Sequence, residues 1–479
     1  MPGFPALPHR RWRRVLPLLP VLALSAVGAR ADDVAPPPAD RELARAIYKE
    51  LVEINTTDSV GDCTQAAEAV AARLRSGGLN ASDIQVLGPN PRKKNLVARL
   101  RGTGRSRPLL LLAHLDVVEA RREDWSFDPF VFREEGGFFY GRGTSDDKAM
   151  AAIFVANLIR YLREGFRPDR DLVLALTADE EGGSSNGVDW LLKNHRDLVD
   201  AELGLNEGGG GQMKAGRRLA NTVQASEKVY QSFRLEVKNP GGHSSLPVPE
   251  NAIYRLAEGL VRLSRYRFPV RLNDVTRQFF ERSAATVAGP EAADRTAVAR
   301  VPPDLAAADR LSEQAYLNAR LRTTCVATLL EGGHAENALP QSARATVNCR
   351  MLPGEKPEDV KAAIVSALAD DKIAVTAVAP AKPSPPSPLT PAVLSPIERI
   401  TTTMWPGVPV VPTMSTGSTD ALYLRAAGIP VYGVDGIFED VDDTRAHGRD
   451  ERVAVSSFYE GQEFLYRLVK ALASAEAKR

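Results

Sequence analysis

The sequence predicts an α/β protein with a mainly parallel sheet covered by helices on both faces, into which a smaller α+β domain is inserted. Three observations lead to this prediction. The 479 residues exceed what one ordinary hydrophobic core accommodates, so we expect two domains. Between residues 95 and 209, continuous apolar runs alternate with amphipathic helical patterns, which is typical of parallel strands buried on both faces. From residue 229 onward, the order of elements changes.

The elements of the first half alternate between strands and helices. Apolar runs predict strands at 95–100, 107–118, 171–181 and 201–209. Apolar residues at helical spacing predict helices at 147–165 and 185–195. Because helices separate most of these strands, the strands are expected to run parallel.

The second half contains one complete β-α-β-β-α-β unit, the order of a ferredoxin-like domain. Its expected strands are 229–237, 323–332, 342–352 and 373–379, and its expected helices are 251–267 and 357–370. Residues 268–322 do not fit this unit and are expected to form a partly helical excursion, whose role the sequence does not assign. The proline-rich stretch 379–391 suits neither a helix nor a central strand, so it is expected to be a linker. The predicted boundaries are therefore 32–226 and 381–479 for the larger domain and 227–380 for the inserted one.

The N-terminal residues predict export. A basic stretch, an apolar stretch of about a dozen residues and small residues at Ala29 and Ala31 are typical of a secretory signal peptide, here 1–31. The alternative, a membrane anchor, needs about 20 apolar residues, and this stretch is shorter and contains Pro17 and Pro20. We therefore expect a secreted or periplasmic protein without stable membrane insertion. The formal net charge of +1 gives no reason to expect nucleic acid as a partner.

Three cysteines are too few for a disulfide framework and lack the spacing of a zinc ribbon. Any metal site must therefore be built from histidine and carboxylate side chains. Cys325 and Cys349 lie almost symmetrically about the connection between two strands that are expected to pair antiparallel. A disulfide between them, with Cys63 free, is a prediction for an oxidising compartment.

Acidic and imidazole groups follow the expected strands. His114 and Asp116 follow one strand, Asp179, Glu180 and Glu181 follow the next, and Glu207 follows the last. Asp146 precedes a helix, and His447 comes late in the chain. Ligands of open α/β sheets bind beyond the carboxyl ends of strands, so these groups are expected to converge.

Each of these features also has a purely structural interpretation. Acids before a helix are good N-terminal residues, and a single histidine at a strand end is more often structural than a ligand. Their conjunction favours the functional interpretation, because so many carboxylates at one edge are costly without cations. Two divalent ions would remove this conflict.

Nine motifs, in this order along the chain, resemble one known family: "LAHLDVV", "YGRGTSDDK", "TADEEGG", "NEGG", "GGHSSLP", "NALP", "NCRMLPG", "GSTDA" and "AHGRDERV". The family is that of the dinuclear zinc exopeptidases (clan MH metallopeptidases), which includes carboxypeptidase G, carnosinase, aminoacylase and succinyl-diaminopimelate desuccinylase. The resemblance implies two Zn²⁺ per chain, with Co²⁺ or Mn²⁺ as substitutes, and an inserted domain that serves as a lid and in dimerisation. One ion would be held by His114, Asp146 and Glu207, and the other by Asp146, Glu181 and His447.

The resemblance also implies roles in catalysis. Glu180 would be the general base, Asp116 would orient His114 through its other ring nitrogen, and the peptide bond after Asp146 would be cis. His243 would stabilise the oxyanion, with Asn337 close by. The substrate carboxylate would be bound by Arg350, Gly417, Ser418 and Thr419.

The substrate is thus expected to be a small peptide or N-acyl amino acid with a free carboxylate. An exopeptidase of the carboxypeptidase or dipeptidase type is the main interpretation, and a deacylase or desuccinylase of the same fold is the alternative. A non-catalytic peptide-binding protein is a third, which the retained Glu180 disfavours. Because the histidine of the "GGHS" motif reaches the partner's site in dimeric relatives, a homodimer in which His243 acts in trans is expected. The alternative is a monomer, since monomeric relatives enlarge the inserted domain and residues 268–322 are an addition to it.

Overall fold

The computed structural model describes residues 35–474. The predicted signal peptide at 1–31 lies outside these residues. Among the described residues, no helix combines the length and the apolar character needed to cross a bilayer.

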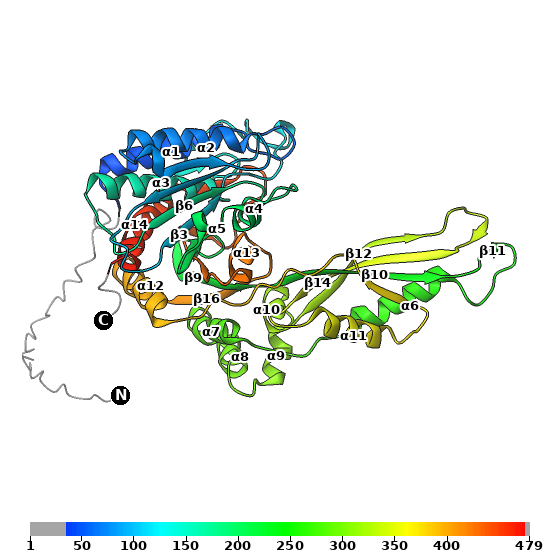
Figure 1. The fold of residues 1–479 in the computed structure, drawn as a ribbon. Coiled ribbons are helices and arrows are strands. Elements are labelled where there is room, and N and C mark those ends of the chain that lie inside the picture. Colours follow the sequence, from blue (N-terminus) through cyan, green and yellow to red (C-terminus); the bar gives the residue numbers. More distant parts are fainter. Residues whose placement is uncertain (1–34, 475–479) are drawn as a thin grey trace, which may run out of the picture. The chain divides into compact units, whose positions relative to one another are not determined.

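The larger sheet has ten strands and confirms the predicted α/β class (Figure 1). Strands β6, β3, β7 and β17 run parallel, whereas the pairings of β1 with β2 and of β2 with β6 are antiparallel. Strand β16 (Val410–Ser415) pairs in parallel with β9. In spatial order the other strands are β1 (Ile84–Leu87), β2 (Asn95–Leu100), β6 (Leu172–Thr177), β3 (Leu109–His114), β7 (Leu203–Asn206), β17 (Val431–Gly433), β9 (Arg217–Glu227), β8 (Gly211–Lys214) and β18 (Phe438–Asp440).

Helices cover both faces of this sheet (Figure 1). On one face, α4, α5 and α13 share a buried cluster with β2, β3 and β6, in which Leu191 of α4 lies with Leu110 of β3 and Val173 of β6. On the other face, α2 and α3 contact β2 and β3, and α3 packs against α1 and α14. These helices are α1 (Pro38–Glu53), α2 (Cys63–Ser76), α3 (Lys148–Arg163), α4 (Gly187–Asn194), α5 (Arg196–Val199), α13 (Ala421–Ala426) and α14 (Val455–Leu472).

A second, four-stranded sheet has the predicted β-α-β-β-α-β order. Its strands lie in the order β12 (Thr324–Gly332), β14 (Ser342–Met351), β10 (Val229–Lys238) and β15 (Ala374–Ala377). Helices α6 (Ala252–Arg265) and α11 (Pro357–Leu368) pack against it, with Leu256 and Ile364 buried beside Phe233 and Val347. Residues 379–390 form neither helix nor strand, as their proline content predicted. Helix α12 (Pro391–Met404) follows them.

The excursion is helical and packs against the larger sheet. It contains α7 (Asp274–Ser283), α8 (Pro290–Val298), α9 (Leu305–Leu311) and α10 (Ala315–Leu321). Phe280 and Leu317 are fully buried in a cluster with Ala220 of β9 and Val411 of β16. The excursion therefore covers strands of the larger sheet, a placement that its sequence pattern did not reveal.

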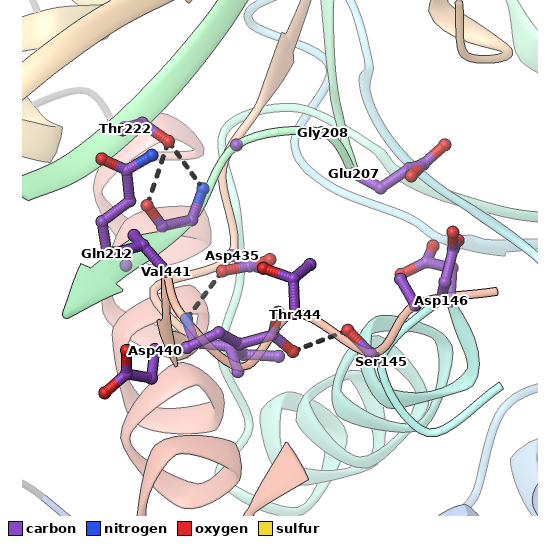
Figure 2. A pocket seen from close by; sticks show the side chains of 17 residues that line it. Ser145, Asp146, Glu207, Gly208, Gln212, Thr222, Asp435, Asp440, Val441 and Thr444 are labelled. Carbon is purple, nitrogen blue, oxygen red and sulfur yellow. Dashed lines mark hydrogen bonds between the residues drawn. The ribbon is translucent and has the colours of Figure 1, made fainter. Parts of the chain in front are cut away.

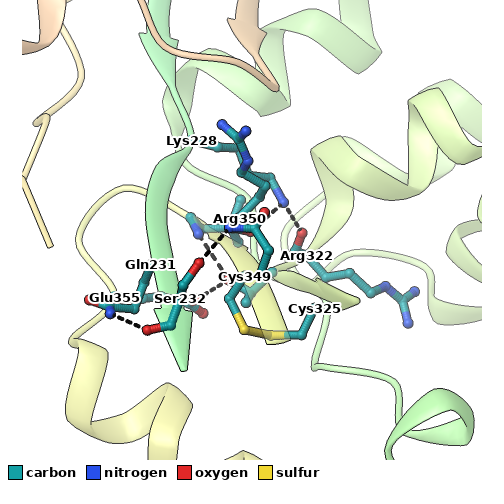
Figure 3. The surroundings of a disulfide bond; sticks show 11 residues. Lys228, Gln231, Ser232, Arg322, Cys325, Cys349, Arg350 and Glu355 are labelled. Atoms are coloured by element: carbon teal, nitrogen blue, oxygen red, sulfur yellow. Dashed lines mark hydrogen bonds between the residues drawn. A yellow bond between two sulfur atoms is a disulfide. The ribbon is translucent and has the colours of Figure 1, made fainter. Parts of the chain in front are cut away.

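The predicted disulfide is confirmed in the structure (Figure 3). Cys325 and Cys349 lie directly opposite each other in the antiparallel pairing of β12 and β14. Cys63 is free and buried.

Two small sheets complete the fold: β11 (Gly242–His243) with β13 (Ala338–Leu339), and β19 (Arg452–Ala454) with β5 (Phe138–Tyr140) and β4 (Arg133–Glu135).

Candidate metal centre

The carboxyl ends of three parallel strands bring the predicted acids and histidine together. Strand β3 ends at His114, which lies beside Thr177 at the end of β6. The acids at 179–181 follow β6, and Glu207 follows β7, which pairs with the other side of β3. Asp146 lies just before α3, and the peptide bond after it is cis, as the resemblance implied.

The five residues expected to hold metal form two groups that share Asp146. His114 Nε2 lies 2.8 Å from Asp146 Oδ1, and His447 Nε2 lies 3.0 Å from Asp146 Oδ2. His447 Nε2 also lies 2.7 Å from Glu181 Oε1. Within each group, the candidate ligand atoms lie within 4.8 Å of one another, and the groups are His114, Asp146 and Glu207, and Asp146, Glu181 and His447. The two oxygens of Asp146 thus face different histidines, as a bridging carboxylate requires.

The donor set fits two divalent cations. Imidazole nitrogens and carboxylate oxygens are the ligands that zinc takes when cysteine is absent. No lysine or arginine in the described part of the chain forms an ion pair with Asp146, Glu181 or Glu207. The negative charge of this site is therefore left for cations to balance.

The crowding changes the pKa values of the site. Burial raises the pKa of Glu207 well above its usual range, and Asp146 adds to this effect. Burial also raises the pKa of Glu180 to about 10. Hydrogen bonds to Asp146 and Glu181 raise the pKa of His447 to about 10. For Asp146, burial acts to raise the pKa, but hydrogen bonds with the two histidines outweigh it and lower the pKa.

Asp116 lies beside the Nδ1 atom of His114 and also contacts the loop that follows β6. His114 Nδ1 lies 3.0 Å from the main-chain oxygen of Asp116 and 3.7 Å from its carboxylate. The carboxylate also accepts the main-chain N–H groups of Glu180 and Glu181, at 3.1 and 2.9 Å. Asp116 therefore adjoins the other ring nitrogen of His114, as the resemblance implied, and its role in orienting the ring stays a prediction. The main-chain carbonyl lies nearer to the ring, and the side chain positions the loop that carries the expected base and ligand.

Asp179 is balanced by a lysine that the sequence interpretation missed. Lys93 Nζ lies 2.6 Å from Asp179 Oδ1, and both side chains are almost completely buried. The same ammonium group lies 2.9 Å from Asp58. Of the three consecutive acids, the first is therefore neutralised within the protein and does not depend on metal.

Glu451 is a second missed residue and links the two segments that carry Asp146 and His447. Its fully buried carboxylate accepts four hydrogen bonds at 2.6–3.1 Å, from the main-chain N–H groups of Gly143, Ser145 and Asp146 and from Arg142 Nη1. Arg142 also donates to the main-chain oxygen of Gly448, at 3.1 Å. The available sequence signal was an acid four residues after His447 in the "AHGRDERV" motif.

Arg350 has no anionic partner among the described residues. Its guanidinium group lies over the Tyr230 ring, 4.9 Å from the centroid, and forms no ion pair with a described residue. Lys228 donates to the main-chain oxygens of Arg322 and Arg350, the latter at 3.0 Å, and so holds the end of β14 beside the disulfide (Figure 3).

Residues 417–419 are only partly available as donors to a substrate. Thr419 donates its N–H and hydroxyl to buried Glu227, at 3.0 and 3.3 Å. Its expected role as a direct donor is therefore corrected, because Glu227 already occupies both groups. The main-chain N–H of Gly417 bonds to the Ser415 hydroxyl, whereas Ser418 is exposed.

His243 and Asn337 lie in exposed positions on connected segments. His243 belongs to β11, its Nδ1 lies 2.7 Å from the Ser245 hydroxyl, and the main-chain oxygen of Asn337 accepts the N–H of Ser244. Within residues 35–474, no hydrogen bond or ion pair joins either residue to the metal-ligand groups. In this single chain, the two residues are not part of the metal centre.

Comparisons with known proteins identify a family. Residues 110–471 match the family described as Peptidase family M20/M25/M40. A probable carboxypeptidase S-like 2 of Dictyostelium discoideum is 28% identical over 387 residues, which cover 78% of this chain and 74% of that protein. A human N-fatty-acyl-amino acid synthase/hydrolase is 28% identical over 374 residues, which cover 76% of this chain and 74% of that protein.

Solved structures share the fold. The crystal structure of an M20 family metallo-carboxypeptidase from Sulfolobus solfataricus superposes with a TM-score of 0.66 at 17% identity. The superposition covers 90% of this chain and 99% of that chain. Nearly the whole length of that structure is therefore represented here.

Proposed function

The chain belongs to peptidase family M20/M25/M40 and is a metal-dependent hydrolase, and from this premise we propose a dinuclear zinc exopeptidase that cleaves the amide bond next to a free carboxylate in small peptides. The observation that carries this proposal is the pair of three-residue ligand groups that share Asp146. One carboxylate with each oxygen facing a different histidine is the arrangement that two neighbouring cations require. The mixed imidazole and carboxylate ligands favour zinc, and Co²⁺ or Mn²⁺ would substitute.

His114, Asp146 and Glu207 would hold one cation, and Asp146, Glu181 and His447 the other. When bound, the two ions would supply an acidified water and polarise the substrate carbonyl. Glu180 would take a proton from that water. This role is supported by its position next to Glu181 and by its carboxylate, which forms no hydrogen bond or ion pair with a described residue. Glu180 would then return the proton to the departing amine.

The inserted domain would complete the substrate site. Arg350 has no anionic partner among the described residues and would clamp the substrate carboxylate in a two-pronged pair. Ser418 and the main chain around it would add donors, with Thr419 holding this loop through Glu227. His243 would stabilise the oxyanion, with Asn337 nearby.

We propose that His243 acts on the partner's metal centre in a homodimer. Among residues 35–474, it forms no hydrogen bond or ion pair with the candidate metal ligands of its own chain. Strand β12 lies at an edge of the four-stranded sheet and exposes Val326, Leu329 and Leu330 by 61, 62 and 70%. An exposed apolar edge strand is suited to pairing with a second copy. We accordingly assign residues 227–380 to a lid and dimerisation domain, and 32–226 and 381–479 to the catalytic domain.

Two further parts of the proposal rest on other observations. Export to the periplasm or the cell exterior rests on the N-terminal sequence, and a disulfide in the inserted domain suits an oxidising compartment. The second candidate activity is hydrolysis of N-acyl amino acids, which the name of the human relative favours.

The test is a substrate panel. Metal-loaded protein would be incubated with dipeptides and with N-acyl amino acids, and the released amine would be followed. We expect amine to be released from substrates whose C-terminal carboxylate is free. Amidation of that carboxylate should abolish the release. Failure to cleave any small amide, although two metals are bound per chain, would contradict the proposal.

A further inference from the structure

A cavity of about 300 Å³ opens beside the first group of metal ligands, and its lining is acidic (Figure 2). Asp146 and Glu207 border it on the side of the metal centre. No lysine, arginine or histidine lines it, whereas four carboxylates outside the ligand set do: Asp147, Asp435, Glu439 and Asp440.

Three of these four carboxylates keep an oxygen that forms no hydrogen bond with a described residue, and Asp435 accepts only the main-chain N–H of Ile437, at 2.6 Å. Asp440 is satisfied, because its oxygens accept the main-chain N–H groups of Asp442 and Ala215. Glu439 accepts a hydrogen bond of 2.6 Å from the Ser145 hydroxyl through one oxygen only. The side chain of Asp147 is 3% exposed, and its Oδ2 has no hydrogen-bond partner.

No basic side chain in residues 35–474 forms an ion pair with Asp147, Asp435 or Glu439. Asp147 is buried, and Asp435 and Glu439 are half-buried with one hydrogen bond each. Carboxylates removed from water without a balancing charge are costly, so a ligand that brings positive charge and N–H donors would stabilise them.

The geometry favours an organic ammonium group over a third metal ion. Among the described residues, only the two groups built on Asp146 bring three ligand atoms within 4.8 Å, and neither includes Asp435 or Glu439. An ammonium group has three donors that can reach separate acceptors, and it needs no compact cage.

The position of the cavity indicates which part of a substrate would enter it. The residues assigned to the substrate carboxylate, Arg350 and 417–419, do not line it. A substrate held at the metal centre by its carboxyl-terminal residue would therefore direct its other part, the acyl side of the scissile bond, toward the acids.

We propose that this cavity binds the free α-ammonium group of the residue before the scissile bond, so that the preferred substrates are small peptides with an unblocked N-terminus. This inference rests on the proposed function, since it assumes cleavage at the metal centre. Glu439 and Asp435 accept hydrogen bonds from the ammonium group, and Asp147 lines the same cavity. N-acyl amino acids lack this charge and bind less tightly.

The test measures binding separately from turnover. Metal-loaded Glu180→Gln protein, which would not consume its substrate, is titrated by calorimetry with a dipeptide and with its N-acetyl derivative. The affinities of the same two compounds are then measured for double variants that combine Glu180→Gln with Glu439→Gln or with Asp435→Asn. Asp442→Asn is the matched control, because it removes one charge from the same loop, is exposed and does not line the cavity. Thermal melting of each variant checks folding.

We expect acetylation to weaken binding about tenfold or more in the parent and in the Asp442 control, as for a charge-assisted hydrogen bond. In a folded Glu439 or Asp435 variant, the ratio of the two dissociation constants, acetylated to free dipeptide, falls toward one because the free dipeptide binds more weakly. Equal or tighter binding of the acetylated compound, or a ratio that survives both substitutions, overturns the inference. Cleavage of neither compound by the wild-type protein would instead contradict the proposed function.

Discussion

Replacement of Glu451 by alanine tests whether the metal centre depends on a residue that binds neither metal nor substrate. Glu451 and Arg142 are 0 and 3% exposed, so the substitution leaves a buried guanidinium group without its carboxylate. It also removes the acceptor of three main-chain N–H groups in the segment that leads to Asp146. The free energy of unfolding and the metal affinity should therefore both fall.

The contacts set the size of the effect. Breaking a buried ion pair from one side costs about 3–5 kcal/mol, and loss of a residue that orients metal ligands lowers metal affinity about 10–100-fold. Urea unfolding of metal-free protein measures the first quantity, and titration against a competing chelator measures the second. Glu135→Ala is the control, since its side chain is 67% exposed in a surface pair and should change the unfolding free energy by about 1 kcal/mol or less.

Two further variants separate charge from packing. Glu451→Gln keeps an acceptor but loses the charge, so its effect should be intermediate. Arg142→Met combined with Glu451→Leu should destabilise less than Glu451→Ala alone, because no unpaired charge remains buried. If Glu451→Ala matches the Glu135 control in both unfolding free energy and metal affinity, Glu451 does not position Asp146.

Three other predictions concern catalysis, the disulfide and assembly. Glu180→Gln should lower turnover at least about 100-fold while elemental analysis still finds two metals, and a residual rate above about a tenth would exclude Glu180 as the base. Unfolded, unreduced protein should show one reactive thiol, that of Cys63, and three would exclude the bond between Cys325 and Cys349. Mixing inactive Glu180→Gln and His243→Ala proteins should restore activity at about a quarter of the sites by symmetry. No recovery despite demonstrated subunit exchange would exclude a trans role for His243.

The long buried strands could be predicted because their sequence pattern is independent of their partners. Leu109–His114 and Leu172–Thr177 are buried along their whole length and appear as continuous apolar runs. Three of the five candidate metal ligands, His114, Glu181 and Glu207, follow from the predicted strands because they lie at or just after the strand ends, whereas Asp146 precedes a helix and His447 lies in a turn. Strands β17 and β18, with three residues each, are too short for any periodicity and were not predicted.

The supporting residues could not be predicted, because they act across large sequence separations. Lys93 and Asp179 are 86 positions apart. Glu451 lies about 300 positions from the main-chain N–H groups that donate hydrogen bonds to it. Lysine and glutamate are ordinary surface residues in a sequence, and only the fold shows that these two are buried. The position of Asp116 beside His114 could be predicted from its spacing in the sequence. The spacing did not reveal that the main-chain oxygen of Asp116 lies nearer to the His114 ring than its carboxylate does.

The three consecutive acids after β6 are distinguished by their partners. Asp179 pairs with Lys93, and Glu181 lies 2.7 Å from His447 within a metal-ligand group. The carboxylate of Glu180 alone has no hydrogen-bond or ion-pair partner among residues 35–474, although its main-chain N–H is fixed by Asp116. A general base must be held in place and still be free to gain and lose a proton. Its main chain is anchored and its carboxylate is not, which is why we assign the proton transfer to Glu180 and not to either neighbour.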